Sequence, residues 1–125
     1  AALDRCFDLV HEALAEGAEA SADDTPEGLL FAMGGAYASL IGNRDLLMLQ
    51  VHAQSAADVP EIAKAFRQGL QRIVKFVKTR TAATDESIQR FIAYGQLCHL
   101  ITTMSLANDT SAWARVLTNG MRHPS

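Results

Sequence analysis

The sequence is poor in cysteine, with only two among its 125 residues. Cys6 and Cys98 lie far apart and show neither a Cys-x-x-Cys motif nor a Cys/His spacing. Disulfide scaffolds and zinc sites instead use several cysteines at short, regular intervals. The sequence therefore predicts a cytoplasmic protein with free thiols, and it leaves a single Cys6–Cys98 disulfide open as the alternative.

Long apolar runs are also missing. The longest, LLFAMGGAYASLI at 29–41, is shorter than the roughly 18 to 20 residues that a membrane-spanning helix needs. Apolar residues still make up 49% of the chain, which is enough for one hydrophobic core at this length. We therefore expect one globular domain over 1–125 with no membrane partner.

The chain lacks the short motifs that carry common enzymatic and metal-binding chemistries. It contains no Glu-x-x-His, His-Glu-x-x-His or Gly-x-Ser-x-Gly motif and no glycine-rich phosphate loop after a strand. The four histidines, at positions 11, 52, 99 and 123, are not related by a metal-ligand spacing. The sequence therefore predicts no catalytic site, no metal and no cofactor.

Charge is low and slightly acidic, with a net value of −3. This argues against nucleic-acid binding by the chain as a whole, because such proteins present a basic surface. Eight of the fourteen acidic residues fall between Asp4 and Glu27, and six of the eleven Lys and Arg residues fall between Lys64 and Arg80. We expect two solvated helix faces that attract each other weakly; a phosphate-binding patch on the basic segment is the alternative.

Apolar residues recur at helical spacing along the whole chain, and no segment alternates as a strand does. In the first segment, for example, Leu3, Phe7, Val10 and Leu14 share one face. The pattern predicts an all-α fold, a bundle of about six helices at 1–20, 26–41, 44–57, 59–80, 85–106 and 110–119.

Polar residues and prolines mark the expected helix starts. Asp24 or Thr25 is suited to cap the helix that begins with Pro26, and Asn43 to cap the next one. Further along, Asp58 and Pro60 predict a sharp corner between two helices. We expect the Asp58 side chain to accept backbone N–H groups of the following turn.

Two adjacent glycines, Gly34 and Gly35, interrupt the second predicted helix, where each costs about 1 kcal/mol relative to alanine. Small alanines nearby favour a close helix crossing at this point. The alternative is a kink that opens a pocket.

The segment 85–106 is apolar around most of its circumference, with a narrow polar strip formed by Gln89, Gln96 and Thr103. Such a helix has to be buried on nearly all sides. We therefore expect a homodimer that covers its outer face, and the alternative is a central core helix of a monomer. The expected contact residues, on this helix and the last one, are Ile88, Ile92, Gly95, His99, Leu106, Trp113 and Leu117.

Adaptable apolar and half-polar side chains on four of the predicted helices suit the wall of a small-molecule cavity. For each of them alone, ordinary core packing is the competing interpretation. His52, together with Gln50 or Gln54, is expected to supply directional hydrogen bonds. The candidate ligand-binding residues are Met33, Tyr37, Met48, His52, Phe66, Phe91 and Cys98.

The helix order and the local patterns LLMLQVHAQSAADVPEI and FIAYGQLCHLITTMSL resemble the C-terminal domain of the tetracycline-repressor (TetR) family of bacterial transcription regulators. The resemblance implies a cytoplasmic transcriptional repressor that senses a small, largely apolar effector. It also implies an N-terminal helix-turn-helix domain that is absent from this chain. Only that domain would bind DNA, and the effector bound in the C-terminal domain would cause DNA release by allosteric coupling.

The same resemblance assigns roles to segments of the chain. It implies that 1–20 is the remainder of the helix linking the two domains, that 28–41, 46–57 and 62–77 enclose the effector, and that 88–106 and 112–118 form the homodimer contact. The last helix is short for that role. Two alternatives from other classes are a small helical enzyme that uses His52 or His99 as a base, and a helical interaction module without a ligand.

Overall fold

In the computed structural model, which describes residues 2–121, the chain forms six α-helices and one short 3-10 turn, so the predicted all-α bundle is confirmed. No strand occurs in this part of the chain. The elements are α1 (Ala2–Ala20), α2 (Pro26–Leu40), α3 (Arg44–Ser55), α4 (Pro60–Thr81), α5 (Asp85–Thr103), the 3-10 turn η1 (Leu106–Asn108) and α6 (Ala112–Thr118).

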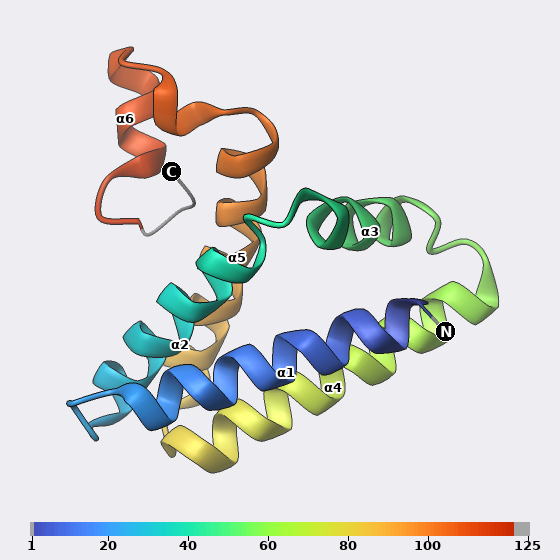
Figure 1. The fold of residues 1–125 in the computed structure, drawn as a ribbon, viewed down its shortest axis with the longest axis horizontal. Coiled ribbons are helices and arrows are strands. Elements are labelled where there is room, and N and C mark those ends of the chain that lie inside the picture. Colours follow the sequence, from blue (N-terminus) through green and yellow to red (C-terminus); the bar gives the residue numbers. More distant parts are fainter. Residues whose placement is uncertain (1, 122–125) are drawn as a thin grey trace.

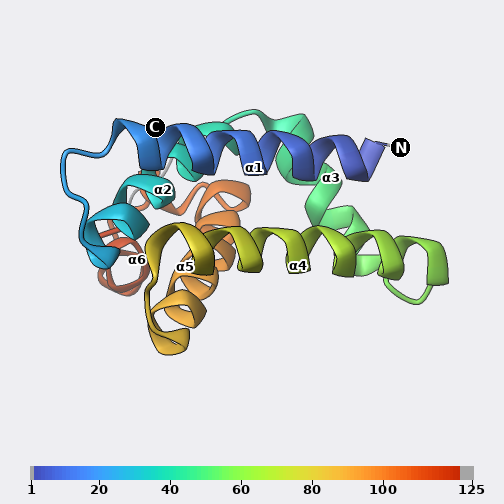
Figure 2. The same cartoon turned by 90° about the horizontal axis from the view of Figure 1, so that it is seen from below.

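Two helix pairs build the bundle. The long helices α1 and α4 lie side by side and run in the same direction, and α2 and α5 rise together from one end of this pair (Figure 1). Helix α3 leads from the end of α2 back towards the start of α4, while α6 lies beyond the far end of α5 (Figures 1 and 2). The space between the two pairs is where the core and the candidate site lie.

Side chains cap three helix starts, and at two of them, Thr25 and Asn43, the cap was predicted. Thr25 caps α2, because its hydroxyl accepts the Gly28 N–H at 3.1 Å, which decides between Asp24 and Thr25. The Asn43 side chain accepts backbone N–H groups at the start of α3. The Thr84 hydroxyl does the same at the start of α5. Each cap satisfies donors that a helix leaves without an internal partner.

Three predicted boundaries were wrong. Val59, not Asp58, occupies the cap position of α4, and no side chain bonds to the turn there; the helix begins at Pro60, one residue after the predicted start. Helix α5 ends at Thr103 because Ser105 adopts a left-handed backbone conformation with φ of 54°, which places Leu106 in the 3-10 turn instead. The last helix begins at Ala112, two residues later than predicted.

The main core lies where α1 meets α2 and α4. Phe7, Val10 and Leu14, the apolar face predicted for the first helix, are buried there together with Met33, Ile73 and Val77 of the facing helices. Close approach depends on two glycines. A Cβ on Gly69 of α4 would overlap the Phe7 ring, and a Cβ on Gly17 of α1 would lie 2.8 Å from the Ala36 Cβ of α2. At these two positions the glycine backbone of one helix therefore packs directly against a side chain of the facing helix.

The oppositely charged segments face each other, as predicted, across α1 and α4. Arg72 donates a hydrogen bond to Asp8, and both side chains are about half exposed. A second exposed pair, Lys78 of α4 with Asp85 of α5 at 2.8 Å, joins α4 to the next helix instead. Pairs in contact with water contribute typically less than about 1 kcal/mol each, so apolar burial holds the two helices together.

Candidate functional site

A cavity of about 460 Å³ lies between the two helix pairs and is open to solvent at its edge. Its walls are predominantly apolar, and this size falls within the usual range of small-molecule sites, roughly 300 to 1,000 Å³. Side chains of α1, α2, α4 and α5 contribute the apolar wall, among them Phe7, Val10, Leu14, Leu30, Leu70, Ile73, Phe91 and Ile92.

Two glycines on facing helices leave this space unfilled. A Cβ on Gly34 of α2 would meet only Phe91 Cε1, at 3.8 Å, and a Cβ on Gly95 of α5 would meet only Tyr37 Cε2, also at 3.8 Å. Both glycines line the cavity. Helix α1 crosses this segment of α2 closely, at Gly17 against Ala32 and Ala36, while Gly34 and Gly35 themselves line the cavity.

A polar chain joins three helices at the inner side of the cavity. The Tyr37 hydroxyl of α2 donates to Gln50 Oε1 of α3 at 3.3 Å, and it is also hydrogen-bonded to His99 Nε2 of α5. Because the hydroxyl has one hydrogen and gives it to Gln50, His99 must donate through Nε2–H to the Tyr37 oxygen. The direction of the chain therefore runs from His99 through Tyr37 to Gln50.

Each end of this chain carries a polar atom without a partner. Gln50 and His99 are each only 5% exposed. Gln50 Nε2, a donor, and His99 Nδ1, left as an acceptor by the direction of the chain, make no hydrogen bond. Buried polar atoms of folded proteins are nearly always paired, so each unpaired one calls for a physical explanation. Gln50 lines the cavity.

The titratable groups around this chain are held in their neutral forms. Burial raises the pKa of the Tyr37 phenol and lowers the pKa of His99, since both charged forms lose hydration. Burial likewise raises the pKa of the Cys6 and Cys98 thiols; Gln50 beside Cys6 opposes this in part. The inner part of the site is therefore polar but uncharged.

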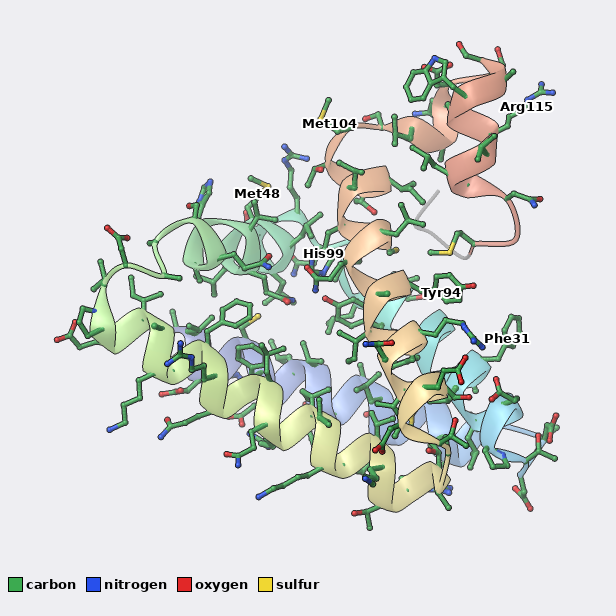
Figure 3. All side chains as sticks on the ribbon, turned by 180° about the vertical axis from the view of Figure 1, so that it is seen from behind. Phe31, Met48, Tyr94, His99, Met104 and Arg115 are labelled. Carbon is green, nitrogen blue, oxygen red and sulfur yellow. The ribbon has the colours of Figure 1, made fainter. Side chains whose placement is uncertain are left out.

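The outer edge of the cavity has a different character. Phe31 of α2 and Tyr94 of α5 lie next to each other on one side of the two helices, whereas His99 lies on the other side of α5 (Figure 3). Tyr94 is 52% exposed. The charged side chains of the lining, Glu27 and Arg90, are also exposed, and Arg90 pairs with Glu86 at 3.0 Å. Charge is thus confined to the solvent side.

The structure brings together some of the predicted ligand-binding residues. Tyr37, Phe91 and Cys98 line the cavity, and so does Gln50. Met33 and Phe66 instead fill the core, where Phe66 makes an edge-to-face contact with Phe7. His52 is exposed on α3, and Met48 points away from α1 and α4 (Figure 3). Both α3 residues lie outside the cavity wall because α3 turns a different face, that of Leu47 and Gln50, inward.

The predicted dimer-contact residues divide into two groups. Ile88, His99 and Leu106 are buried within the single chain, and Ile92 and Gly95 line the cavity. Trp113 is exposed and Leu117 half-buried on α6. The large exposed apolar side chains of this region are Leu100, Met104, Trp113 and Val116. They lie at the end of α5 and on α6.

Several site residues were not anticipated for this role. Phe31 and Tyr94 belong to apolar faces that a single-helix pattern assigns to packing. His99 was assigned to the dimer contact, although its position on the face of α5 shared with Ile88 and Ile92 signals an inward direction. Gln50 was anticipated only as one of two amides, with Gln54, that could assist His52.

No group of three or more His, Cys, Asp or Glu side chains within residues 2–121 is arranged to hold a metal ion. Cys6 and Cys98 are both buried thiols. None of the helices in the described part of the chain combines the length and apolarity that crossing a membrane requires. Comparison with protein-family models, curated proteins and solved structures finds no match.

Proposed function

We propose that this chain is a small-molecule-sensing and dimerising domain of a TetR-like bacterial transcription regulator. The observation that carries the sensing part is the apolar cavity with the hydrogen-bonded polar chain of His99, Tyr37 and Gln50 at its inner side. Natural small-molecule sites have this composition, apolar walls with a few directed polar groups. Core packing alone does not explain the open space beside Gly34.

The mechanism would be a shift between two arrangements of the bundle. Helix α1 contributes Phe7, Val10 and Leu14 to the cavity wall, so a bound molecule contacts α1 directly. In the proposed full-length regulator α1 continues from a helix-turn-helix domain. An effector that fits one position of α1 better than another would then change the spacing of two DNA-reading heads.

Ligand-induced thermal stabilisation tests the sensing part. We expect small, largely apolar molecules to raise the melting temperature, since a ligand that binds only the folded state stabilises it by mass action. Gly34→Leu, which would place a side chain in the cavity, is expected to abolish the response. Ala93→Leu, at an exposed position of the neighbouring helix, is the matched control and should keep it. An interaction module without a pocket would show no response in any variant.

The homodimer part rests on the exposed apolar side chains at the end of α5 and on α6. Met104 is 64% and Val116 75% exposed. Clusters of large apolar side chains on a surface mark interaction sites. We expect sedimentation at micromolar concentration to show a dimer that Met104→Lys and Val116→Lys convert to monomer. Val74→Lys, an equally drastic change on α4, should leave the dimer intact; a monomeric parent protein would refute this part alone.

The enzyme alternative makes a different prediction. A base would have to be His52, which is exposed on α3, or His99, which is buried with a lowered pKa. Replacing each by alanine and measuring any detected turnover separates the two classes. Turnover that disappears with His99→Ala but persists with His52→Ala would favour a catalytic cavity over a sensing one.

A further inference from the structure

Helices α1 and α4 form a layer with one open side. Helices α2, α3 and α5 pack on the other side, and Figure 2 shows the open side with α1 and α4 in front of the other helices of the described chain. Val10 of α1 and Ile73 of α4 are buried in the core on the covered side. Side chains on the opposite faces of the two helices therefore point to the open side.

On α1 the open side carries an acidic ridge, formed by Asp4, Asp8, Glu12 and Glu16. These residues follow one another at intervals of four, so they share one face of the helix. Glu12 and Glu16 are exposed and form no ion pair within residues 2–121. Like charges four residues apart destabilise a helix slightly. The ridge would therefore gain from a cationic partner.

On α4 the open side carries a cationic ridge. Its side chains, all exposed, are Lys64, Arg67, Gln71, Lys75 and Lys78. They recur at intervals of three or four residues and so share one face. Lys75 forms no ion pair within the described chain, whereas Lys78 pairs with Asp85. The two ridges thus have opposite charge and lie next to each other in one layer.

The two ridges are also aligned along the helix axes. Helices α1 and α4 run in the same direction (Figure 1), and three contacts fix their register, namely Phe7 with Gly69, Asp8 with Arg72, and His11 with Phe76. The partners in these contacts are separated by 62 to 65 positions in the sequence. At the same separation, Lys75 lies level with Glu12, and Lys78 lies level with Glu16.

We propose that the open side of α1 and α4 binds the same surface of a second copy of this chain, about a twofold axis parallel to the two helices. Rotation about such an axis keeps each residue at its position along the axis and exchanges the places of α1 and α4. The cationic ridge of each copy then lies on the acidic ridge of the other, with Lys75 opposite Glu12. This inference does not depend on the proposed sensing function.

Charge complementarity favours a second copy over other partners. A nucleic acid or an anionic membrane would attract the cations of α4 but would be repelled by the acidic ridge beside them. A second copy presents both charges in exchanged order, as the open side requires. Exposed ion pairs are individually weak and are screened by salt, so we expect a weak association that depends on ionic strength.

Sedimentation of the intact chain at low and high salt tests the contact, at protein concentrations up to about 1 mM. The Debye length is about 30 Å at about 10 mM salt and about 3 Å at about 1 M. We expect the association constant to fall at least about tenfold between these conditions. An apolar contact through α5 and α6 would instead persist in high salt. The absence of any association that weakens with salt would overturn the proposal and leave the contact at α5 and α6 untouched.

Charge reversal tests the proposed pairing of Glu12 with Lys75. Glu12→Lys and Lys75→Glu each place like charges opposite one another twice in a twofold contact, so each variant alone should lose the salt-sensitive association. An equimolar mixture of the two variants should regain it, because both contacts then join opposite charges again. An unfolded variant could not give this result.

Arg44→Glu, at an exposed position of α3, changes the net charge as Lys75→Glu does and is the matched control. It should keep the salt-sensitive association. The pairing would be refuted by single variants that associate like the parent chain, by a mixture that fails to associate, or by an Arg44→Glu variant that loses association as Lys75→Glu does.

Discussion

Tyr37 of α2 accepts a hydrogen bond from His99 of α5, sixty-two residues further along the chain. The same hydroxyl donates to Gln50 of α3, so a single side chain connects three helices around the cavity. Gln50 and His99 are buried and Tyr37 is partly buried, which makes this connection specific, because a buried polar group that loses its partner keeps the full cost of its desolvation.

Removing that hydroxyl should therefore destabilise the fold. Tyr37→Phe leaves His99 Nε2–H and Gln50 Oε1 without their partner, and we expect a loss of about 1 to 3 kcal/mol in the free energy of unfolding. Urea denaturation measures it. Tyr94→Phe is the matched control, since the Tyr94 side chain is largely exposed, and it should change stability little. Equal effects of the two changes would contradict the buried chain of hydrogen bonds.

The same substitution at two helical glycines should act in opposite directions. Gly34→Ala adds a methyl group in ordinary contact with Phe91, so the gain in helix propensity, up to about 1 kcal/mol, should raise stability. Gly69→Ala drives a methyl group into the Phe7 ring and should cost about 1 to 3 kcal/mol. Urea denaturation of both variants decides the matter; destabilisation by Gly34→Ala would show that the space beside it is absent.

Stability should fall as the solution becomes acidic through the range of histidine titration. Burial lowers the pKa of His99 in the folded state, so below the ordinary histidine pKa of about 6.5 the unfolded chain binds more protons than the folded one. The free energy of unfolding then decreases with falling pH, by at most about 1.4 kcal/mol per pH unit for one group.

Urea denaturation at several pH values between about 7.5 and 5.5 measures this effect. The slope of the free energy of unfolding against pH should correspond to the uptake of about one proton at most on unfolding. The groups facing His99, the Tyr37 phenol and the neighbouring Cys98 thiol, have raised pKa values and do not titrate there. The lowered pKa values of Asp8 and Asp85 place those carboxyl groups below this range. His99→Gln should reduce the dependence of the free energy of unfolding on pH. If the slope did not change, the pH dependence would have to come from another histidine.

Both thiols should react slowly with reagents in the folded protein. Cys6 and Cys98 are buried, and burial raises the pKa of each thiol, which reduces the reactive thiolate. We expect Ellman's reagent to modify them at neutral pH only as the protein unfolds. A cysteine placed at exposed Val116 provides the fast reference. Immediate modification of either native thiol would contradict its burial.

The parts of the fold that were predictable are those governed by neighbouring residues. Thr25, Asn43 and Thr84 cap their helices because each side chain reaches backbone donors two or three residues away. Asp58 shows the limit of this reasoning. It precedes the cap position by one residue, and no local rule distinguishes a corner capped by Asp58 from one that begins at Val59.

The site was predictable only in part. Tyr37, Phe91, Cys98 and Gln50 have the chemistry of a pocket wall and do line the cavity. Met48 and His52 have similar chemistry, but the packing of α3 directs another face inward. Periodicity identifies the faces of a helix, whereas the choice of the face that meets a given neighbour depends on how the helices pack.

The sequence by itself determined that this chain is helical and where most of its helices begin, because these properties depend on local hydrogen bonds and on the spacing of apolar residues. Only the tertiary structure decided that Gly34 and Gly95 face a common space and that His99, Tyr37 and Gln50 form one chain. The physical reason is distance along the sequence. A cavity is bounded by side chains from separate helices, and its existence depends on what each helix leaves unfilled opposite the others.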